Sequence, residues 1–272
     1  MLLGQRLTEN RLWYIIKSRK TLQENKMNLE RFLKVQEQTY KEIRDLRVLD
    51  TGAKADVALQ ERRGGFFVSL IHASDITRNA ARLSSKIAHI VPSITYQCEH
   101  IHTTVGRVIK EFGPHFYCDP DSETNRNVLA LLGEIVKDAM TKLNTPYPKI
   151  IYTEYLTTRN SVIAIGAPNE WFTNFAEALV DISKQAGMEI APPWGAHITV
   201  SRFTEKITKK ELGGLSDLLR IYTPLGISIP VAVAIGYTFR RREEQKCRDL
   251  RETPGHFKPY IVFALSFRNT SL

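Results

Sequence analysis

His102-Thr-Thr104-Val-Gly-Arg107 and His197-Ile-Thr199-Val-Ser-Arg202 are two versions of one six-residue pattern, His-x-Thr-Val-small-Arg, that begin 95 residues apart. The chain has seven histidines, and only these two are followed by Thr at the second position, Val at the third and Arg at the fifth. Each of these residue types is only moderately common in proteins, so chance does not account for both copies. We therefore expect the two copies to be halves of one site.

Both copies lie in stretches rich in β-branched residues, and these stretches predict strands over Ile94–Val108 and Ala196–Phe203. Residues two positions apart on a strand share a face. The histidine and the threonine of each copy are therefore expected to point to the same side of the sheet and to contact one ligand together.

Strict alternation has different consequences for the residues around each motif. It places His100 on the same face as the first motif histidine, and it turns Arg107 and Arg202 to the opposite face. A bend at Gly106 or Ser201 is the alternative that brings an arginine round to a bound phosphate. We take Arg202 as the stronger candidate of the two arginines.

The rest of the chain alternates strand and helix patterns, with one motif strand in each half, which predicts a two-lobed α+β fold and not a doubly wound parallel sheet. The helix from residue 76 is closed near Pro92, and Gly187 ends the helix that precedes the second motif. Further strands are expected over Phe66–Ile71, Lys149–Leu156, Ser161–Ile165, Ile227–Phe239 and Pro259–Phe267, and helices over Ile76–Ile90, Asn127–Leu143, Glu170–Gln185 and Lys209–Tyr222.

The first 60 residues differ from the rest in their pattern. Thr8–Leu49 contains no Gly or Pro and is dominated by residues that favour helices. We expect one or two amphipathic helices packed on the main domain, and the alternative is an arm that binds a protein partner or self-associates. A linker near Thr51–Ala55 then leads to a main domain over residues 61–272.

Composition narrows the setting and the partners. A net charge of +9 favours anionic partners, namely RNA, nucleotides or an acidic membrane surface. No apolar run approaches the roughly 18 residues that span a bilayer, so no membrane insertion is expected, and no secretory signal is evident. Three widely spaced cysteines argue against a disulfide framework and a paired-cysteine zinc site, which favours a reducing cytoplasmic location.

Two imidazoles and two hydroxyls that converge on one ligand suit attack on a phosphodiester. One histidine takes a proton from the attacking hydroxyl or water, and the other gives a proton to the leaving oxygen. An ordinary histidine pKa of about 6.5 allows both roles near neutral pH. The threonine hydroxyls donate hydrogen bonds to the non-bridging oxygens as negative charge develops. This chemistry requires no metal and no cofactor.

The paired His-x-Thr strands resemble the 2H phosphoesterase superfamily, which includes RNA 2′,3′-cyclic phosphodiesterases, the 2′-5′ RNA ligases and enzymes that cleave 2′-5′ oligoadenylates. The resemblance covers about residues 64–272 and leaves out the N-terminal helices. It implies a bilobal fold of two mainly antiparallel sheets with flanking helices and pseudo-twofold symmetry. It also implies a metal-independent hydrolase in which His102, Thr104, His197 and Thr199 are catalytic.

Other residues are weaker candidates for substrate contacts. Trp194 is placed to stack on a base or to pack in the core, and His100 to contact substrate, to pair with His102 on a metal or simply to be exposed. The charged Arg240–Arg251 loop is either solvated or a clamp for the substrate. Two other functions remain open, namely a nucleotide- or RNA-binding module without turnover and an interaction protein that acts through its N-terminal helices.

Overall fold

The computed structural model describes residues 28–45, 50, 52–56, 65–109, 123–143, 147–238 and 257–264. The predictions made for residues 1–27 and for the Arg240–Arg251 loop lie outside these residues.

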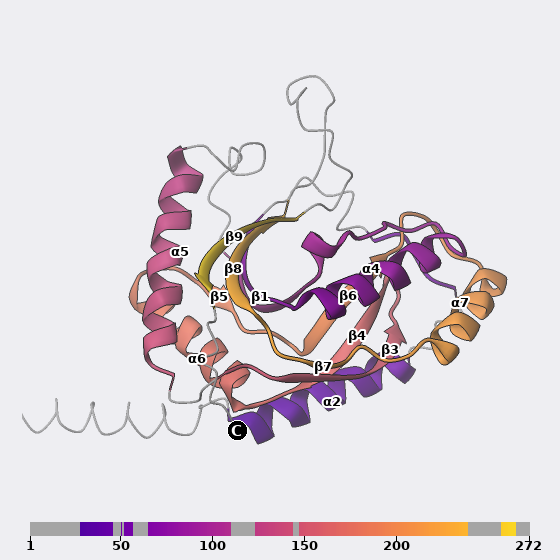
Figure 1. The fold of residues 1–272 in the computed structure, drawn as a ribbon, viewed down its shortest axis with the longest axis horizontal. Helices are drawn as coiled ribbons and strands as arrows, with labels where there is room; N and C mark the ends of the chain where they lie inside the picture. The colour runs from indigo at the N-terminus through magenta and orange to yellow at the C-terminus, as the bar shows by residue number, and fades with distance from the viewer. Residues whose placement is uncertain are drawn as a thin grey trace, which may run out of the picture.

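One nine-stranded sheet forms the centre of the fold and is strongly curved (Figure 1). The strands lie in the order β7-β3-β4-β6-β2-β1-β8-β9, with β5 paired to β2, and every pairing between described strands is antiparallel. The expected α+β class is therefore confirmed. The strand bounds are Gly65–Ile71 for β1, His102–Val108 for β2, Ile150–Thr157 for β3, Ser161–Pro168 for β4, Ile190–Ala191 for β5, Ala196–Arg202 for β6, Gly226–Ser228 for β7, Ala232–Thr238 for β8 and Phe257–Ala264 for β9.

Apart from β5, the sheet consists of two four-stranded halves, and each half begins with a motif strand. One half runs β6-β4-β3-β7 and the other β2-β1-β8-β9, and they meet where Thr103 pairs with Ile198. This pairing joins the two expected sheets into one. The equivalent positions of β2 and β6, each the innermost strand of its half, agree with the expected pseudo-twofold arrangement.

Helices cover the sheet on both sides and complete the core. In Figure 1, α5 stands beside β8 and β9, α4 crosses β6, and α2 runs along β3. Helix α6 packs against α5 and against β2 and β5. None of the helices in the described part of the chain is long and apolar enough to cross a membrane. The helix bounds are Leu29–Asp45 for α2, Ser74–Ala88 for α4, Glu123–Thr141 for α5, Glu170–Gln185 for α6 and Lys209–Ile221 for α7, with a 3₁₀ turn at Cys98–His100.

Two expected strands are shorter than the sequence pattern predicts. The first motif strand begins at His102 and not at Ile94, because the Ile94 amide donates to the Arg202 carbonyl at the end of β6 and the chain then forms the 3₁₀ turn. The stretch predicted over Ile227–Phe239 is divided into β7 and β8. Pro230 lies between them and has no amide hydrogen for a ladder.

Strand β2 contains a β-bulge against β1. Val68 is opposite Gly106 and Ser69 is opposite Thr104, so Val105 is an extra residue with no partner. Such a bulge shifts the alternation of side chains by one residue beyond it.

Strand β6 contains the same bulge at the same motif position. Val162 of β4 is opposite Ser201 and Ile163 is opposite Thr199, so Val200 is the extra residue. The valine of the six-residue pattern is therefore the bulge residue in both copies.

We predict that Gly106→Ala destabilises the fold, because there is no room for a methyl group beyond the first bulge. A Cβ at this position would lie 2.8 Å from Cγ2 of Ile190. Since Cγ2 belongs to a buried, β-branched side chain whose rotation about χ1 is restricted, it has little freedom to move aside. The free energy of unfolding in urea should fall by about 1–3 kcal/mol.

Gly65→Ala in β1 is the matched control, because a Cβ there has no neighbour within 4 Å. Equal unfolding free energies for the two variants would contradict the tight packing beyond the bulge.

Candidate functional site

The structure brings the four predicted motif residues together in a crossed arrangement. The pair Thr103–Ile198 sets the antiparallel register between β2 and β6. Continued by one residue in each direction, this register places the histidine of each strand opposite the threonine of the other. Directly opposite residues have Cβ atoms about 4.5–5.5 Å apart. The four side chains therefore form one compact group across the seam of the sheet.

Burial confirms that the four residues share one face. His102, Thr104, His197 and Thr199 are all partly exposed, whereas Thr103 and Ile198 between them are buried. We refer to this face as the motif face.

Both motif arginines return to the motif face because of the bulges. In β2, Val105 and Gly106 are both buried and Arg107 is exposed. In β6, Val200 and Ser201 are both buried and Arg202 is partly exposed. The expectation from strict alternation, that the arginines face the opposite way, is wrong, and the bend occurs one residue before the small residue. In both copies of the six-residue pattern, the histidine, the threonine and the arginine therefore lie on the motif face, and the valine is the bulge residue.

The His102 ring is fixed by a backbone carbonyl and by an aromatic ring. Its Nδ1 lies 2.8 Å from the carbonyl oxygen of His100. The ring stacks on Phe67 of β1, with centroids 4.9 Å apart and planes at 29°.

The His197 ring is held in the same way in the other half. Its Nδ1 lies 3.1 Å from the carbonyl oxygen of Gly195. The ring stacks on Trp194, with centroids 4.1 Å apart and planes at 28°. Trp194 remains 42% exposed, so core packing does not account for it.

These contacts decide which nitrogen of each ring carries the proton. A carbonyl oxygen only accepts hydrogen bonds, so Nδ1 must be the donor in both His102 and His197. In the neutral ring Nε2 then carries no proton, and its lone pair makes it the basic nitrogen. Each motif histidine is therefore prepared to take a proton at Nε2, and to give one up there once protonated.

The electrostatics of the site favour neutral histidines. The pKa of His102 and that of His197 are each lowered to about 4. The main cause in both is burial, which the hydrogen bonds to the carbonyls of His100 and Gly195 partly oppose. The positive charge of Arg202 lowers both values further, which places this arginine near both rings.

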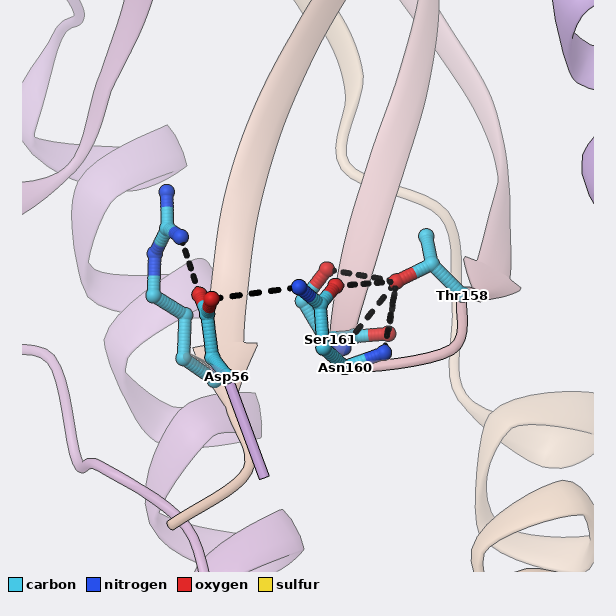
Figure 2. A network of polar contacts seen from close by, with 5 residues as sticks. Asp56, Thr158, Asn160 and Ser161 are labelled. Atoms are coloured by element: carbon cyan, nitrogen blue, oxygen red, sulfur yellow. Dashed lines mark hydrogen bonds and ion pairs between the residues drawn. The ribbon is translucent and has the colours of Figure 1, made fainter. Parts of the chain in front are cut away.

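Arg202 is held by a buried carboxylate that the sequence pattern did not identify. Its guanidinium forms an ion pair with Asp56, whose side chain is only 1% exposed, and it also hydrogen-bonds Tyr96. Asp56 accepts a second hydrogen bond from the side-chain amide of Asn160 at 3.1 Å (Figure 2). Asp56 comes directly after the expected linker, and no motif or spacing in the sequence marks it.

The turn between β3 and β4 fixes Asn160 in turn. The Thr158 hydroxyl lies 2.7 Å from the Ser161 hydroxyl (Figure 2). It also accepts hydrogen bonds from the backbone amides of Asn160 and Ser161 at 3.3 and 3.0 Å. A rigid hairpin turn thus supports Asp56 through Asn160, and Asp56 in turn orients Arg202.

His100 occupies a different position from the expected one. It ends the 3₁₀ turn, is 7% exposed, and its Nδ1 accepts a hydrogen bond from the Gln97 amide at 3.2 Å. It is neither a strand residue nor an exposed one. Its clearest contribution to the site is the backbone carbonyl that anchors His102.

A second polar network lies behind the motif strands, on the opposite face. Thr103 Oγ1 is 2.5 Å from the Tyr152 hydroxyl and 3.0 Å from Nε2 of His72, and Nδ1 of His72 is 2.7 Å from the Ser228 hydroxyl. All four residues are buried. Burial is the main cause that lowers the pKa of His72 to about 3, so this ring is neutral and the network links strands from both halves of the sheet.

Comparisons with known proteins find similarity in structure only. No protein-family model and no curated protein sequence matches the chain. Among solved structures, it is similar to E. coli LigT in complex with 3′-AMP, with 12% identity and a TM-score of 0.42 over 72% of this chain and 94% of that one. It is also similar to TT0787 of Thermus thermophilus, with 14% identity and a TM-score of 0.47 over 74% and 97%. A third is the conserved protein ATU0111 of Agrobacterium tumefaciens strain C58, with 12% identity and a TM-score of 0.44 over 82% and 99%.

We predict that the free energy of unfolding decreases on acidification below about pH 6.5. Unfolded histidines titrate at about 6.5, whereas the folded pKa values are about 4 for His102 and His197 and about 3 for His72. The contribution of these three neutral histidines to the free energy of unfolding is therefore fully present above the unfolded pKa and is lost as the pH falls below it. The slope is up to about 1.4 kcal/mol per pH unit for buried His72 and smaller for the two partly exposed rings.

Urea unfolding between about pH 7 and pH 5 measures this slope. Proton NMR of the histidine rings provides the residue assignment. Midpoints near 6.5 for both motif histidines would contradict the desolvated site.

Proposed function

We propose that this chain is a metal-independent phosphodiesterase of the 2H phosphoesterase type that acts on RNA ends or nucleotides. The observation that carries the proposal is the crossed group of His102, Thr199, His197 and Thr104 on one face of the sheet. Both histidines are anchored at Nδ1 and so present Nε2 for proton transfer.

For a 2′,3′-cyclic phosphate, one histidine removes a proton from water as the water oxygen bonds to phosphorus. The bond from phosphorus to one ribose oxygen breaks, and the other histidine, protonated, donates its proton to that oxygen. The product is a phosphomonoester with a free ribose hydroxyl. The two threonine hydroxyls donate hydrogen bonds to the non-bridging oxygens as negative charge builds.

A 2′-5′ linkage is cleaved by the same groups with a different nucleophile. The neighbouring ribose 3′-hydroxyl loses its proton to one histidine and attacks phosphorus. The 5′ oxygen leaves with a proton from the other histidine, and a 2′,3′-cyclic phosphate is formed. The near-symmetric anchoring of His102 and His197 suits either ring to either role, so the orientation of the substrate selects base and acid.

The reaction needs one proton on the pair of histidines, whose pKa values of about 4 leave both neutral in the free protein at neutral pH. A bound phosphodiester adds a negative charge that offsets the positive charge of Arg202. This raises the pKa of the histidine pair toward neutrality, and the first proton belongs to the pair and not to one ring.

The substrate class and the setting follow from charge and composition. A net charge of +9 favours an anionic polymer or nucleotide, and the exposed Trp194 ring offers a stacking surface for a base next to His197. A cytoplasmic location is part of the proposal and rests on three widely spaced cysteines, of which Cys98 is a free, exposed thiol.

We predict that His102→Ala and His197→Ala each lower turnover by about 10²–10⁴, because each removes one proton transfer. Turnover of a 2′,3′-cyclic nucleotide and of a 2′-5′ dinucleotide is measured with a chelator present. His89→Ala is the matched control, because His89 is exposed at the end of α4 and outside the site. Wild-type rates in both motif variants would refute the assignment, and tight nucleotide binding without any product would favour the non-catalytic binding module.

We predict that Arg202→Lys raises KM by about tenfold, which corresponds to about 1.4 kcal/mol, with a smaller effect on kcat. Lysine keeps a positive charge beside Asp56 but loses the planar fork that can contact Asp56 and a phosphate at once. Arg107→Lys is the comparison, and we expect a smaller rise because Arg107 is exposed and screened by solvent. An unchanged KM in Arg202→Lys would exclude this arginine from phosphate binding.

A further inference from the structure

We refer to His102 with the residues that contact it as the first half-site, and to His197 with the residues that contact it as the second. Helix α2 bridges β4 and β6 of the second half-site through the buried side-chain amide of Gln36. Gln36 is 5% exposed, its Nε2 donates to the carbonyl of Gly166 at 3.0 Å, and its Oε1 accepts from the amide of Ala196 at 2.7 Å. Gly166 and Ala196 are opposite each other in the β4–β6 pairing. The helix thus supplies hydrogen bonds to both backbones one residue before His197.

Tyr40 makes a second set of contacts one turn further along α2. Burial raises its pKa, so the hydroxyl is protonated and donates to the carbonyl of Ala196 at 3.2 Å. The ring packs edge-on against Trp194, with centroids 5.9 Å apart and planes at 81°. A Cβ on Gly195 would lie 2.8 Å from the Tyr40 hydroxyl oxygen, so the helix approaches this residue closely.

These contacts lie on the motif face. Tyr40 packs with Leu156, Ile163 and Ile165, and Ile165 is directly opposite His197 in the β4–β6 pairing. Helix α2 contacts Trp194, Gly195 and Ala196, the three residues before His197. Trp194 stacks on the His197 ring, the Gly195 carbonyl accepts the hydrogen on its Nδ1, and Ala196 begins its strand.

The first half-site is supported by a helix through residues at a greater distance along the chain from its histidine. Helix α4 packs against the 3₁₀ turn, and its Ser84 hydroxyl donates to the carbonyl of Ile94 and accepts from the amide of Tyr96 at 2.8 Å.

His102 stacks on Phe67 of the neighbouring strand, and its carbonyl partner, His100, belongs to a 3₁₀ turn closed by Gln97. The neighbouring strand and the 3₁₀ turn therefore contact His102 directly, whereas α2, more than 150 residues earlier in the sequence, contacts the residues that directly precede His197.

We propose that α2 is a positioning element of the site, in which Gln36 and Tyr40 fix the Trp194–Ala196 segment and thereby the tautomer and orientation of His197. Without these contacts the Gly195 carbonyl is free to turn away from Nδ1. The imidazole then also adopts the tautomer with its proton on Nε2, which cannot accept a proton from the nucleophile. The effect on turnover rests on the proposed function, but the effect on the His197 tautomer does not.

The test of this proposal is the ring ¹⁵N NMR spectrum of the full-length Gln36→Met protein at neutral pH. Methionine fills similar space without hydrogen bonds, so we expect a mixture of tautomers at His197 and an unchanged Nδ1–H tautomer at His102. Gln38→Met is the matched control, because Gln38 is exposed on the same helix and its amide donates to Glu42, away from the site. A wild-type His197 spectrum in folded Gln36→Met, or equal changes at both histidines, would overturn the proposal.

Tyr40→Phe is the second variant and guards against unfolding in Gln36→Met, since it keeps the ring and loses one hydroxyl. We expect a smaller shift of the same His197 signals. In an active protein, kcat of Gln36→Met should fall between about 10- and 100-fold, because a misplaced catalytic group is costly, while KM changes little. If the wild type is inactive and Gln36→Met shows the expected tautomer change at His197, the proposed phosphodiesterase activity is refuted and the positioning role of α2 is supported. If the wild type is active and Gln36→Met shows no tautomer change, the activity is supported and the positioning role is refuted.

Discussion

The pairing of Thr103 with Ile198 is the constraint on which the site depends, because it joins the two halves of the sheet and sets their register. Each motif strand contains only one of the two motif histidines. The antiparallel register crosses the copies, so that each histidine lies beside the threonine of the other half. The same Thr103 side chain enters the buried network with His72 and Tyr152 on the opposite face, which stabilises the seam from behind.

The two halves are alike where they meet and unlike in what supports them. Each histidine has an anchored Nδ1 and a stacked aromatic ring, and each motif strand has its bulge at the valine. Within the described residues, the second half has Asp56 beside its arginine and α2 against the segment before its histidine. Gln36, Tyr40 and Asp56, which precede the boundary expected near residue 60, therefore contact the second half-site directly.

The sequence predicted the parts of the site that repeat and missed the parts that depend on distant contacts. Alternation within a strand was sufficient to group His102 with Thr104 and His197 with Thr199. It gave the wrong direction for both arginines, since a bulge is a property of a strand pair and neither strand shows it alone. Asp56, Gln36 and Tyr40 were not identifiable, because their partners lie more than 100 residues away and carry no local signal.

The bulges have a consequence for how such a site tolerates change in length. Two residues separate each arginine from its threonine, and this spacing places the arginine on the motif face only because one of the two is the bulge residue. Removing Val105 or Val200 would take out the extra residue, so the strand would alternate regularly and its arginine would stay on the same face as the threonine. Regular pairing with both intervening residues kept would instead turn the arginine to the opposite face, so the bulge is as much a part of the site as the residues that form it.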